Sequence, residues 1–326
     1  MTPTFSRRRL AGATLAGAAV AGLSPALSWA QGFPARQVHY VSPYPPGGTN
    51  DLVARVVSRK LAARFAQPVI VDNRGGAGGT IGTQFVVQAP ADGYTVLNAS
   101  SGNLSSAPQV LGAPYDPLGD LVPVGFLGHI RFVFAVHPSV PANTLAEFIA
   151  YAKKNPRKIN YGTAGNGTGG HIAGEYLRLR TGIDIVHVPY RGSAPALNDA
   201  VAGHVQLVLD PLAAQHVRAG ELRALAYSGA TSSPDLPGVP SLEAAGLPGW
   251  EATNFYLAAV PAKTPASVVE QLHRQFVALA RDADTVAQLK VLGVEIQPLS
   301  MPQISALLKA EIDANNRVIR AAGITA

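Results

Sequence analysis

Cysteine is missing from this 326-residue chain, so the protein has no disulfide, no thiolate metal ligand and no cysteine nucleophile. Charged residues are scarce as well, at 14% of the chain against 47% hydrophobic residues, a balance typical of a globular protein. The eight histidines occur in no HxH or HExxH spacing, the pattern that many metal sites use. We therefore expect neither a metal nor another cofactor.

Long apolar runs are also lacking beyond residue 30, so the sequence predicts no membrane-spanning helix there. The first thirty residues have the pattern of an export signal, with three arginines at 7–9, an uncharged run at 10–23, and small side chains at Ser28 and Ala30. We expect residues 1–30 to be cleaved and the mature protein to be periplasmic. The arginines favour a twin-arginine signal over an ordinary secretory signal, which is the alternative.

The positive charge of the chain does not point to nucleic acid. The formal net charge of +6 falls to +3 once the signal and its three arginines are removed. No cluster of Lys and Arg interleaved with aromatic residues follows in the mature chain. The sequence therefore favours a small-molecule partner over a nucleic acid.

Strand-like and helix-like segments alternate along most of the chain. An apolar strand at 38–42 is followed by a helical pattern at 50–66 and by a second buried strand at 68–72. The same alternation runs from 159 to 227. This order of elements predicts an α/β fold.

Two apolar segments, 124–136 and 253–260, are placed to carry the chain out of one lobe and back again. We predict that residues 31–130 plus 253–326 form lobe one and that residues 131–252 form lobe two. Two crossovers of this kind support hinge closure on a ligand.

Two glycine-rich loops share one design. The first, at 44–51 (YPPGGTND), can turn tightly and approach a ligand closely, and Thr49 or Asn50 can cap the helix that follows. The second lies at 161–175. Each loop presents free N–H groups and the positive end of a helix dipole, which suits an anion.

A polar cluster at 100–103 follows the third strand, at the edge where open α/β sheets bind ligands.

The second loop also matches a dinucleotide-binding fingerprint at Gly165, Gly167 and Gly170. In that fingerprint an acidic residue at the end of the second strand binds the ribose. Asp184 is instead at the beginning of its strand, and Tyr190 lies at the end. We therefore reject a dinucleotide site.

Several ionisable residues are candidates for the cleft. Asp210, at a strand end, favours the cleft, and Arg191 is the preferred cation. For Asp51 a helix-dipole role and a ligand contact are equally open. Glu175 and His171 are interpreted as structural or packing residues. The sequence supplies no G-x-S-x-G elbow and no acid–base pair whose spacing demands catalysis, so we predict no catalytic residue.

Seven segments resemble, in order and over nearly all of the mature chain, the Bug-type substrate-binding receptors of tripartite tricarboxylate transporters. They are residues 44–55, 71–79, 91–95, 114–117, 161–165, 187–192 and 220–226. One departure is the run at 100–106 (SSGNLSS), because relatives commonly have a Thr-His-type segment there.

The resemblance implies a two-lobed periplasmic-binding-protein fold of the type II-like, Venus flytrap kind, with the ligand in the cleft. It further implies that backbone N–H groups and ordered waters hold a ligand carboxylate, with few direct salt bridges. Carried over by position, the implied ligand-binding residues are Tyr44, Pro45, Gly47, Gly48, Asp51, Ser100, Asn103, Thr163, Ala164, Gly165, Thr168, Tyr190 and Asp210.

We therefore expect a monomeric periplasmic receptor that captures a small organic acid, or a related polar metabolite, and presents it to inner-membrane components of a tripartite tricarboxylate-type transporter. We expect no enzymatic activity. The alternatives are a periplasmic enzyme acting on a small carboxylate and a ligand sensor for a signalling partner.

Overall fold

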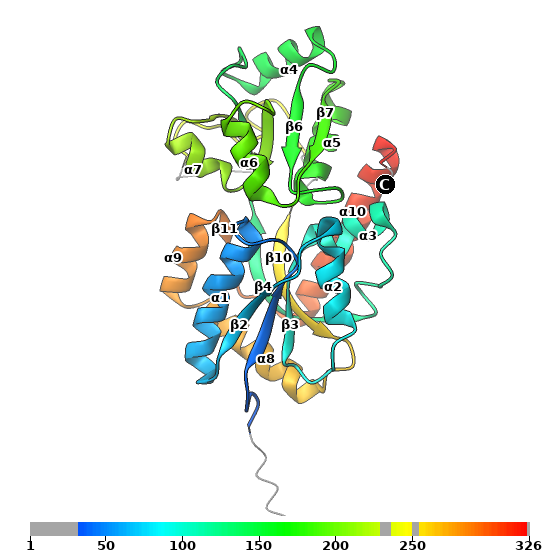
Figure 1. The fold of residues 1–326 in the computed structure, drawn as a ribbon, viewed down its shortest axis with the longest axis vertical. Helices are drawn as coiled ribbons and strands as arrows, with labels where there is room; N and C mark the ends of the chain where they lie inside the picture. The colour runs from blue at the N-terminus through cyan, green and yellow to red at the C-terminus, as the bar shows by residue number, and fades with distance from the viewer. Residues whose placement is uncertain (1–31, 229–235, 250–253, 325–326) are drawn as a thin grey trace, which may run out of the picture. The chain divides into compact units, whose positions relative to one another are not determined.

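The computed structural model describes residues 32–228, 236–249 and 254–324 (Figure 1). The chain divides into two units, Met1–Gly32 and Phe33–Ala326, and the second unit is the subject here. The predicted export signal lies outside the described residues. Within the described part of the chain, no helix is long and apolar enough to cross a membrane.

The first lobe is built on a six-stranded sheet. Strands β1, β2 and β3 pair in parallel, and β10 then joins antiparallel to both β3 and β4, in the order β11-β4-β10-β3-β1-β2. The strands are β1 (Val38–Ser42), β2 (Val69–Asn73), β3 (Thr95–Ser100), β4 (Leu121–Ile130), β10 (Phe255–Pro261) and β11 (Val294–Glu295).

Helices around this sheet are α1 (Thr49–Phe65), α2 (Thr80–Val87), α3 (Ala107–Leu111), α8 (Ala266–Leu279) and α9 (Ala283–Val291), with a short 3-10 turn at Ala77–Gly79 and a π-helical turn at Gly102–Ser106. One face of α1 buries Val53, Val57 and Leu61 against the sheet, because these apolar residues recur at helical spacing.

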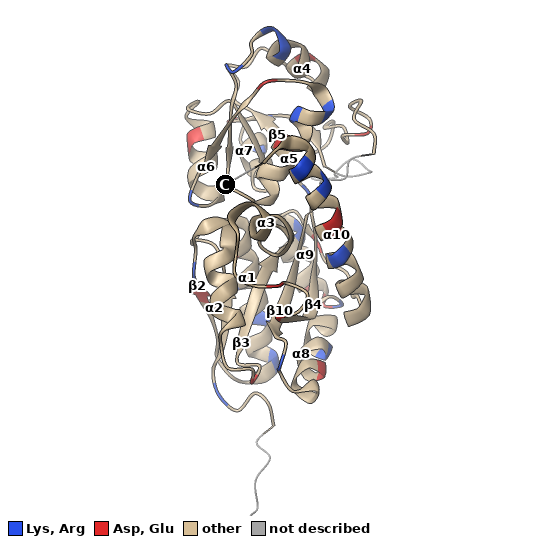
Figure 2. Cartoon of the chain, turned by 90° about the vertical axis from the view of Figure 1, so that its right-hand side faces the viewer, with Lys and Arg blue, Asp and Glu red and all other residues tan. Residues whose placement is uncertain are grey.

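The second lobe is built on a five-stranded sheet in the order β7-β6-β8-β5-β9. Its elements are β5 (Val133–Val136), α4 (Leu145–Lys154), β6 (Asn160–Thr163), α5 (Gly169–Thr181), β7 (Val186–Pro189), α6 (Ser193–Val201), β8 (Leu207–Asp210), α7 (Ala213–Arg218) and β9 (Arg223–Tyr227). Charged residues lie mainly on the helices and loops around the sheets, such as α4, α5 and α10 (Figure 2). The strands are largely apolar, so each sheet can be covered on both faces.

Three segments join the lobes. The chain passes from β4 to β5 through Phe132 and returns from β9 to β10. The terminal helix α10 (Met301–Ala322) is the third, because Ile304 and Leu308 pack in a first-lobe cluster whereas Val318 packs in the second-lobe core (Figure 1). The lobe boundaries given above stay a prediction, and α10 contributes to the core on both sides.

Candidate functional site

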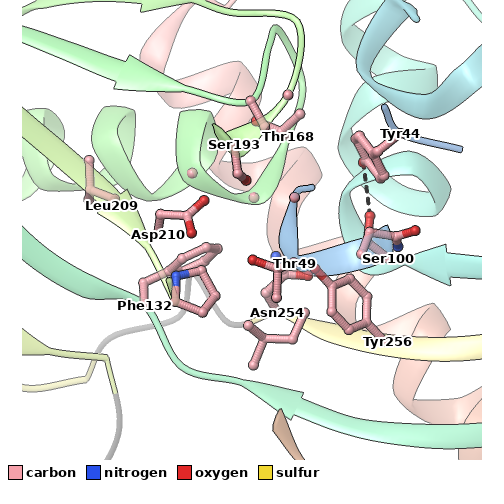
Figure 3. A pocket seen from close by; sticks show the side chains of 18 of the residues that line it. Tyr44, Thr49, Ser100, Phe132, Thr168, Ser193, Leu209, Asp210, Asn254 and Tyr256 are labelled. Carbon is pink, nitrogen blue, oxygen red and sulfur yellow. Dashed lines mark hydrogen bonds between the residues drawn. The ribbon is translucent and has the colours of Figure 1, made fainter. Parts of the chain in front are cut away.

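A pocket lies where the two sheets face each other, and we call it the interlobe pocket (Figure 3). About 550 Å³ of space not filled by atoms lies within it, part of which is open to solvent. Both lobes supply its walls. The lining residues are Tyr44, Pro45, Gly48, Thr49, Asn50, Ser100, Ile130, Phe132, Ala164, Thr168, Gly169, Gly170, Gly192, Ser193, Leu209, Asp210, Pro211, Asn254 and Tyr256.

Three helices begin at the interlobe pocket. Thr49 opens α1 from the first lobe, while Gly169 opens α5 and Ser193 opens α6 from the second. None of the three N-cap residues makes a side-chain capping hydrogen bond. The first N–H groups of a helix have no partner inside the helix, and the dipole places partial positive charge there. The pocket therefore offers an anion three sets of backbone donors.

Thr49 adds a side-chain donor to this arrangement. It is 3% exposed, and its Oγ1 has no hydrogen-bond partner among the described residues. The Thr49 hydroxyl lies beside Asp210 and Tyr256, whose pKa values are both raised by burial. A buried, unpartnered hydroxyl is costly unless something else occupies its hydrogen bond. A bound ligand would supply that bond.

The expected cap differs from the observed one. The sequence predicts that Thr49 or Asn50 caps the first helix, but α1 begins one residue earlier, with Gly48 as its N-cap. The Asn50 side chain is used elsewhere, since its Oδ1 accepts from the Ser42 hydroxyl at 2.9 Å and its Nδ2 donates to the Asn98 carbonyl at 3.0 Å. Thr49 is consequently free to face the interlobe pocket.

Asp210 ends strand β8 and points into the space between Thr49 and Ser193 (Figure 3). Its Oδ1 accepts from the Leu212 N–H at 2.9 Å. Burial raises the pKa of the Asp210 carboxyl, and the neighbouring Ser193 hydroxyl and Leu212 N–H offset only part of that rise.

Tyr44 and Ser100 form the wall on the first-lobe side. The Tyr44 hydroxyl donates to the Gly78 carbonyl at 3.0 Å and shares a 3.0 Å hydrogen bond with Ser100. Asn103 holds Ser100 from behind, because its Oδ1 accepts from the Ser100 N–H at 2.6 Å and from the Ser100 hydroxyl at 2.8 Å. Burial raises the pKa of Tyr44 to about 12, so this side of the pocket stays neutral at physiological pH.

Close backbone approach between the lobes depends on glycine. A Cβ at Gly169 would lie 2.2 Å from the Asn254 Nδ2 atom. Gly167 has φ +71°, and a Cβ there would lie 2.6 Å from the Ala107 Cα. The Gly167 carbonyl also accepts from the Ser106 hydroxyl of the first lobe at 2.5 Å. Larger residues at these positions would hold the lobes apart.

The predicted ligand-binding residues fall into three groups. Seven of them line the interlobe pocket: Tyr44, Pro45, Gly48, Ser100, Ala164, Thr168 and Asp210. Gly165 and Tyr190 line an adjoining cavity, which also includes Arg191 and shares Tyr44 and Pro45 with the interlobe pocket. Gly47, Asp51, Asn103 and Thr163 line neither cavity: the last three are buried, whereas Gly47 is exposed. A ligand contact for any of them stays a prediction.

Asp51 braces the first loop. Its carboxylate accepts from the Gly47 N–H, the Arg55 Nε and the Asn73 Nδ2, each at 2.9 Å. Burial alone would raise the pKa of Asp51, but these bonds outweigh burial and lower it. The sequence left open a helix-dipole role and a ligand contact for Asp51, and bracing of the loop is neither of these; a ligand contact stays a prediction.

The second loop is braced by a pair of stacked histidines and by Glu175. His171 and His187 stack with their ring centroids 4.0 Å apart, and the Gly167 N–H donates to the His171 Nδ1 at 3.1 Å. Thr163 Oγ1 and His187 Nε2 are 2.6 Å apart. Glu175 accepts from the Tyr161 hydroxyl at 2.6 Å. His171 and Glu175 thus have the packing roles that the sequence suggested.

Sequence reasoning missed part of the lining. Thr49, Phe132, Ser193, Asn254 and Tyr256 were not among the predicted residues. Ser193 could have been predicted from the sequence, because it follows Gly192 at a turn between a strand and a helix, just as Thr49 follows Gly48. Phe132 and Asn254 flank the two crossovers, and only the spatial meeting of those segments brings them together.

No group of three or more His, Cys, Asp or Glu residues suited to a metal ion occurs among the described residues. A ligand in the interlobe pocket would therefore meet helix termini, hydroxyl groups, aromatic rings and one carboxyl group.

Comparison with known proteins identifies the family. The family model for the tripartite tricarboxylate transporter family receptor, TctC, matches residues 53–324. The chain is 37% identical over 264 residues to protein BugT of Bordetella pertussis, an alignment that covers 78% of this chain and 79% of BugT.

Two solved structures have the same fold. R. palustris Rpa4515 with adipate superposes with a TM-score of 0.86 at 33% identity, covering 90% of this chain and 99% of that one. The periplasmic binding protein BugD gives a TM-score of 0.85 at 30% identity, with the same coverage. The two-lobed α/β fold and the family resemblance predicted from the sequence are thereby confirmed. The chain belongs to the tripartite tricarboxylate transporter family of receptors, as a protein of the Bug type.

Proposed function

We propose that this chain is a periplasmic receptor that captures a small carboxylate in the interlobe pocket and presents it to the membrane components of a tripartite tricarboxylate-type transporter. The observation that carries the proposal is the convergence of three helix N-termini on the buried, unpartnered hydroxyl of Thr49. Backbone donors of this kind bind anions without a fixed cation. The adipate bound by Rpa4515 is consistent with the same ligand class.

The proposal includes the boundaries of the moving parts and the site of export cleavage. Residues 31–130 and 253–326 would form one lobe and residues 131–252 the other, closing on the ligand about the crossovers. Cleavage after Ala30 would release the mature monomer. N-terminal sequencing of protein purified from the periplasm tests the cleavage site, and its mass in solution tests the monomer.

The experiment for ligand capture is calorimetric titration of the mature protein with a panel of small carboxylates. At least one should bind at one site per chain. Thr49→Val keeps the shape of the side chain but removes the donor, so the affinity should fall about tenfold or more, as expected for a lost bond to a charged group. Thr95→Val is the matched control, because Thr95 begins β3 and does not line the interlobe pocket.

Three results would contradict the receptor proposal. If no carboxylate bound, or if Thr49→Val bound as tightly as the wild type, the anion site would not be at α1. If a compound were converted rather than bound reversibly, the protein would be an enzyme acting on that carboxylate. Product analysis of each titrated solution distinguishes conversion from binding.

A further inference from the structure

Asp210 carries the only charge among the described residues that line the interlobe pocket. The rest of the lining consists of glycine, proline, hydroxyl and amide side chains, aromatic rings and aliphatic residues. A ligand with two carboxylates would place the first at the helix N-termini, but the second would meet no arginine or lysine there. It would instead share the pocket with Asp210, a group of the same sign.

The position of Asp210 relates it to the anion site. Its carboxyl group points between Thr49, at the start of α1, and Ser193, at the start of α6 (Figure 3). A carboxylate bound to the first N–H groups of those helices would therefore lie beside Asp210. Whatever group the ligand carries on the adjacent carbon would face the Asp210 carboxyl.

Aromatic rings line the part of the interlobe pocket around Asp210. Phe132 and Tyr256 both line the interlobe pocket around Thr49 and Asp210 (Figure 3). Aromatic faces attract an ammonium group, and the attraction grows when the group is removed from water. No arginine or lysine is among the described residues that line the interlobe pocket with Asp210. His216 lies outside this lining but is near enough to lower the pKa of the Asp210 carboxyl. An ammonium ion in the pocket would neutralise this carboxylate directly.

We propose, on the basis of the carboxylate-receptor function, that Asp210 accepts a hydrogen bond from a ligand ammonium group, so that the interlobe pocket selects α-amino acids over dicarboxylates. The carboxylate of the amino acid binds the N-termini of α1 and α6, and its α-ammonium group pairs with Asp210. The ligand side chain then extends along the remaining wall. Burial raises the pKa of the Asp210 carboxyl, and an ammonium partner would lower it.

The competing possibility is that Asp210 takes up a proton and donates it to a second carboxylate. The two mechanisms predict opposite effects of Asp210→Asn. An asparagine amide is a neutral donor, so it would preserve the hydrogen bond to a dicarboxylate and remove the charge that attracts an ammonium group. The variant therefore separates them.

The test is calorimetric titration of the mature wild-type protein with three matched series: the twenty common amino acids, the 2-keto and 2-hydroxy acids of the same skeletons, and dicarboxylates of four to six carbons, including malate and adipate. We expect the tightest ligand to be an amino acid, with at least about 30-fold preference over its 2-hydroxy counterpart. That factor corresponds to the lower range for truncating one partner of a buried charge pair.

In Asp210→Asn, the affinity for that amino acid should fall by at least about 30-fold, while at least one dicarboxylate should bind more tightly than it does to the wild type. Asp184→Asn is the matched control, because it removes one negative charge from the same lobe away from the interlobe pocket. The control should keep the wild-type ranking.

The outcomes separate the two proposals. If only dicarboxylates or nitrogen-free monocarboxylates bind the wild type, the assignment of Asp210 is wrong and the carboxylate receptor stands. If Asp210→Asn keeps the wild-type preference for an amino acid, the assignment is wrong as well. If no member of any series binds, the receptor function itself fails. The wild-type ranking alone decides the question should Asp210→Asn not fold.

Discussion

The two glycine-rich loops at the interlobe pocket have similar sequences but are held by different chemistry. The first loop is fixed by a buried carboxylate, Asp51, which gathers donors from Gly47, Arg55 and Asn73. The second is fixed by two stacked histidines, His171 and His187. The first loop therefore depends on a buried carboxylate that stays charged, whereas the second depends on two histidines that stay neutral. The comparison shows that two glycine-rich loops of similar sequence can be held in place by different side chains.

The largest difference between the loops should come from adding a methyl group. Gly169→Ala should reduce ligand affinity by at least about 30-fold, because the new Cβ would lie 2.2 Å from the Asn254 amide and would prevent the lobes from closing. Gly48→Ala, at the N-cap of α1 in the first lobe, should be milder, since its Cβ would lie 3.6 Å from Ser193. Calorimetric titration measures both. Equal losses would mean that close approach at Gly169 does not limit closure.

Removing the charged support of the first loop should have the next largest effect. Asp51→Ala removes the acceptor of the Gly47 N–H, of the Arg55 Nε and of one of the two hydrogen bonds that Asn73 Nδ2 donates, so it should lower the free energy of unfolding by about 2–3 kcal/mol. Asp72→Ala removes a partly exposed partner of Arg74 in the same lobe and should cost less than about 1 kcal/mol. Urea denaturation compares the two. A loss at Asp51 no larger than that at Asp72 would show that the loop does not need the buried carboxylate.

The histidine pair that supports the second loop should make the free energy of unfolding depend on pH. Burial and the adjacent His171 lower the pKa of His187 to about 3, whereas the unfolded chain keeps the usual value of about 6.5. Between these values the unfolded state binds a proton that the folded state does not. The free energy of unfolding should therefore fall as the pH drops from about 6.5 towards 3, by up to about 1.4 kcal/mol per pH unit.

His187→Gln removes this titration, so its stability should decline less between pH 7 and pH 4.5 than that of the wild type. Asp51 contributes little in that interval, because its lowered pKa makes its loss of stability begin near pH 3.8 and extend below it. Denaturation curves at the two pH values provide the measurement. Parallel declines in wild type and variant would contradict the account of the histidine pair.

Much of the fold could be predicted because it depends on local pattern. The alternation of apolar strands and amphipathic helices indicates the α/β class, and the glycine loops mark the points where α1 and α5 begin. Tyr44, Gly48 and Thr168 reach the interlobe pocket for the same local reason, since each lies at the junction of a strand and the following helix.

The segment after β3 shows where local pattern fails. Residues 100–106 are rich in serine and glycine, which favour loops over helices, yet the chain forms a π-helical turn at Gly102–Ser106 followed by α3. Distant contacts stabilise it: Asn315 of α10 donates to the Ser105 hydroxyl at 2.7 Å. Support from a residue about two hundred positions away leaves no signal in the local sequence.

The most direct test of the account is a crystal structure of the mature protein with its tightest-binding carboxylate. We predict that the ligand carboxylate lies about 3 Å from the first N–H groups of α1 and α6 and from the Thr49 hydroxyl, inside the interlobe pocket. A ligand whose carboxylate instead binds in the adjoining cavity at Tyr190 and Arg191 would contradict the central claim that converging helix N-termini form the anion site.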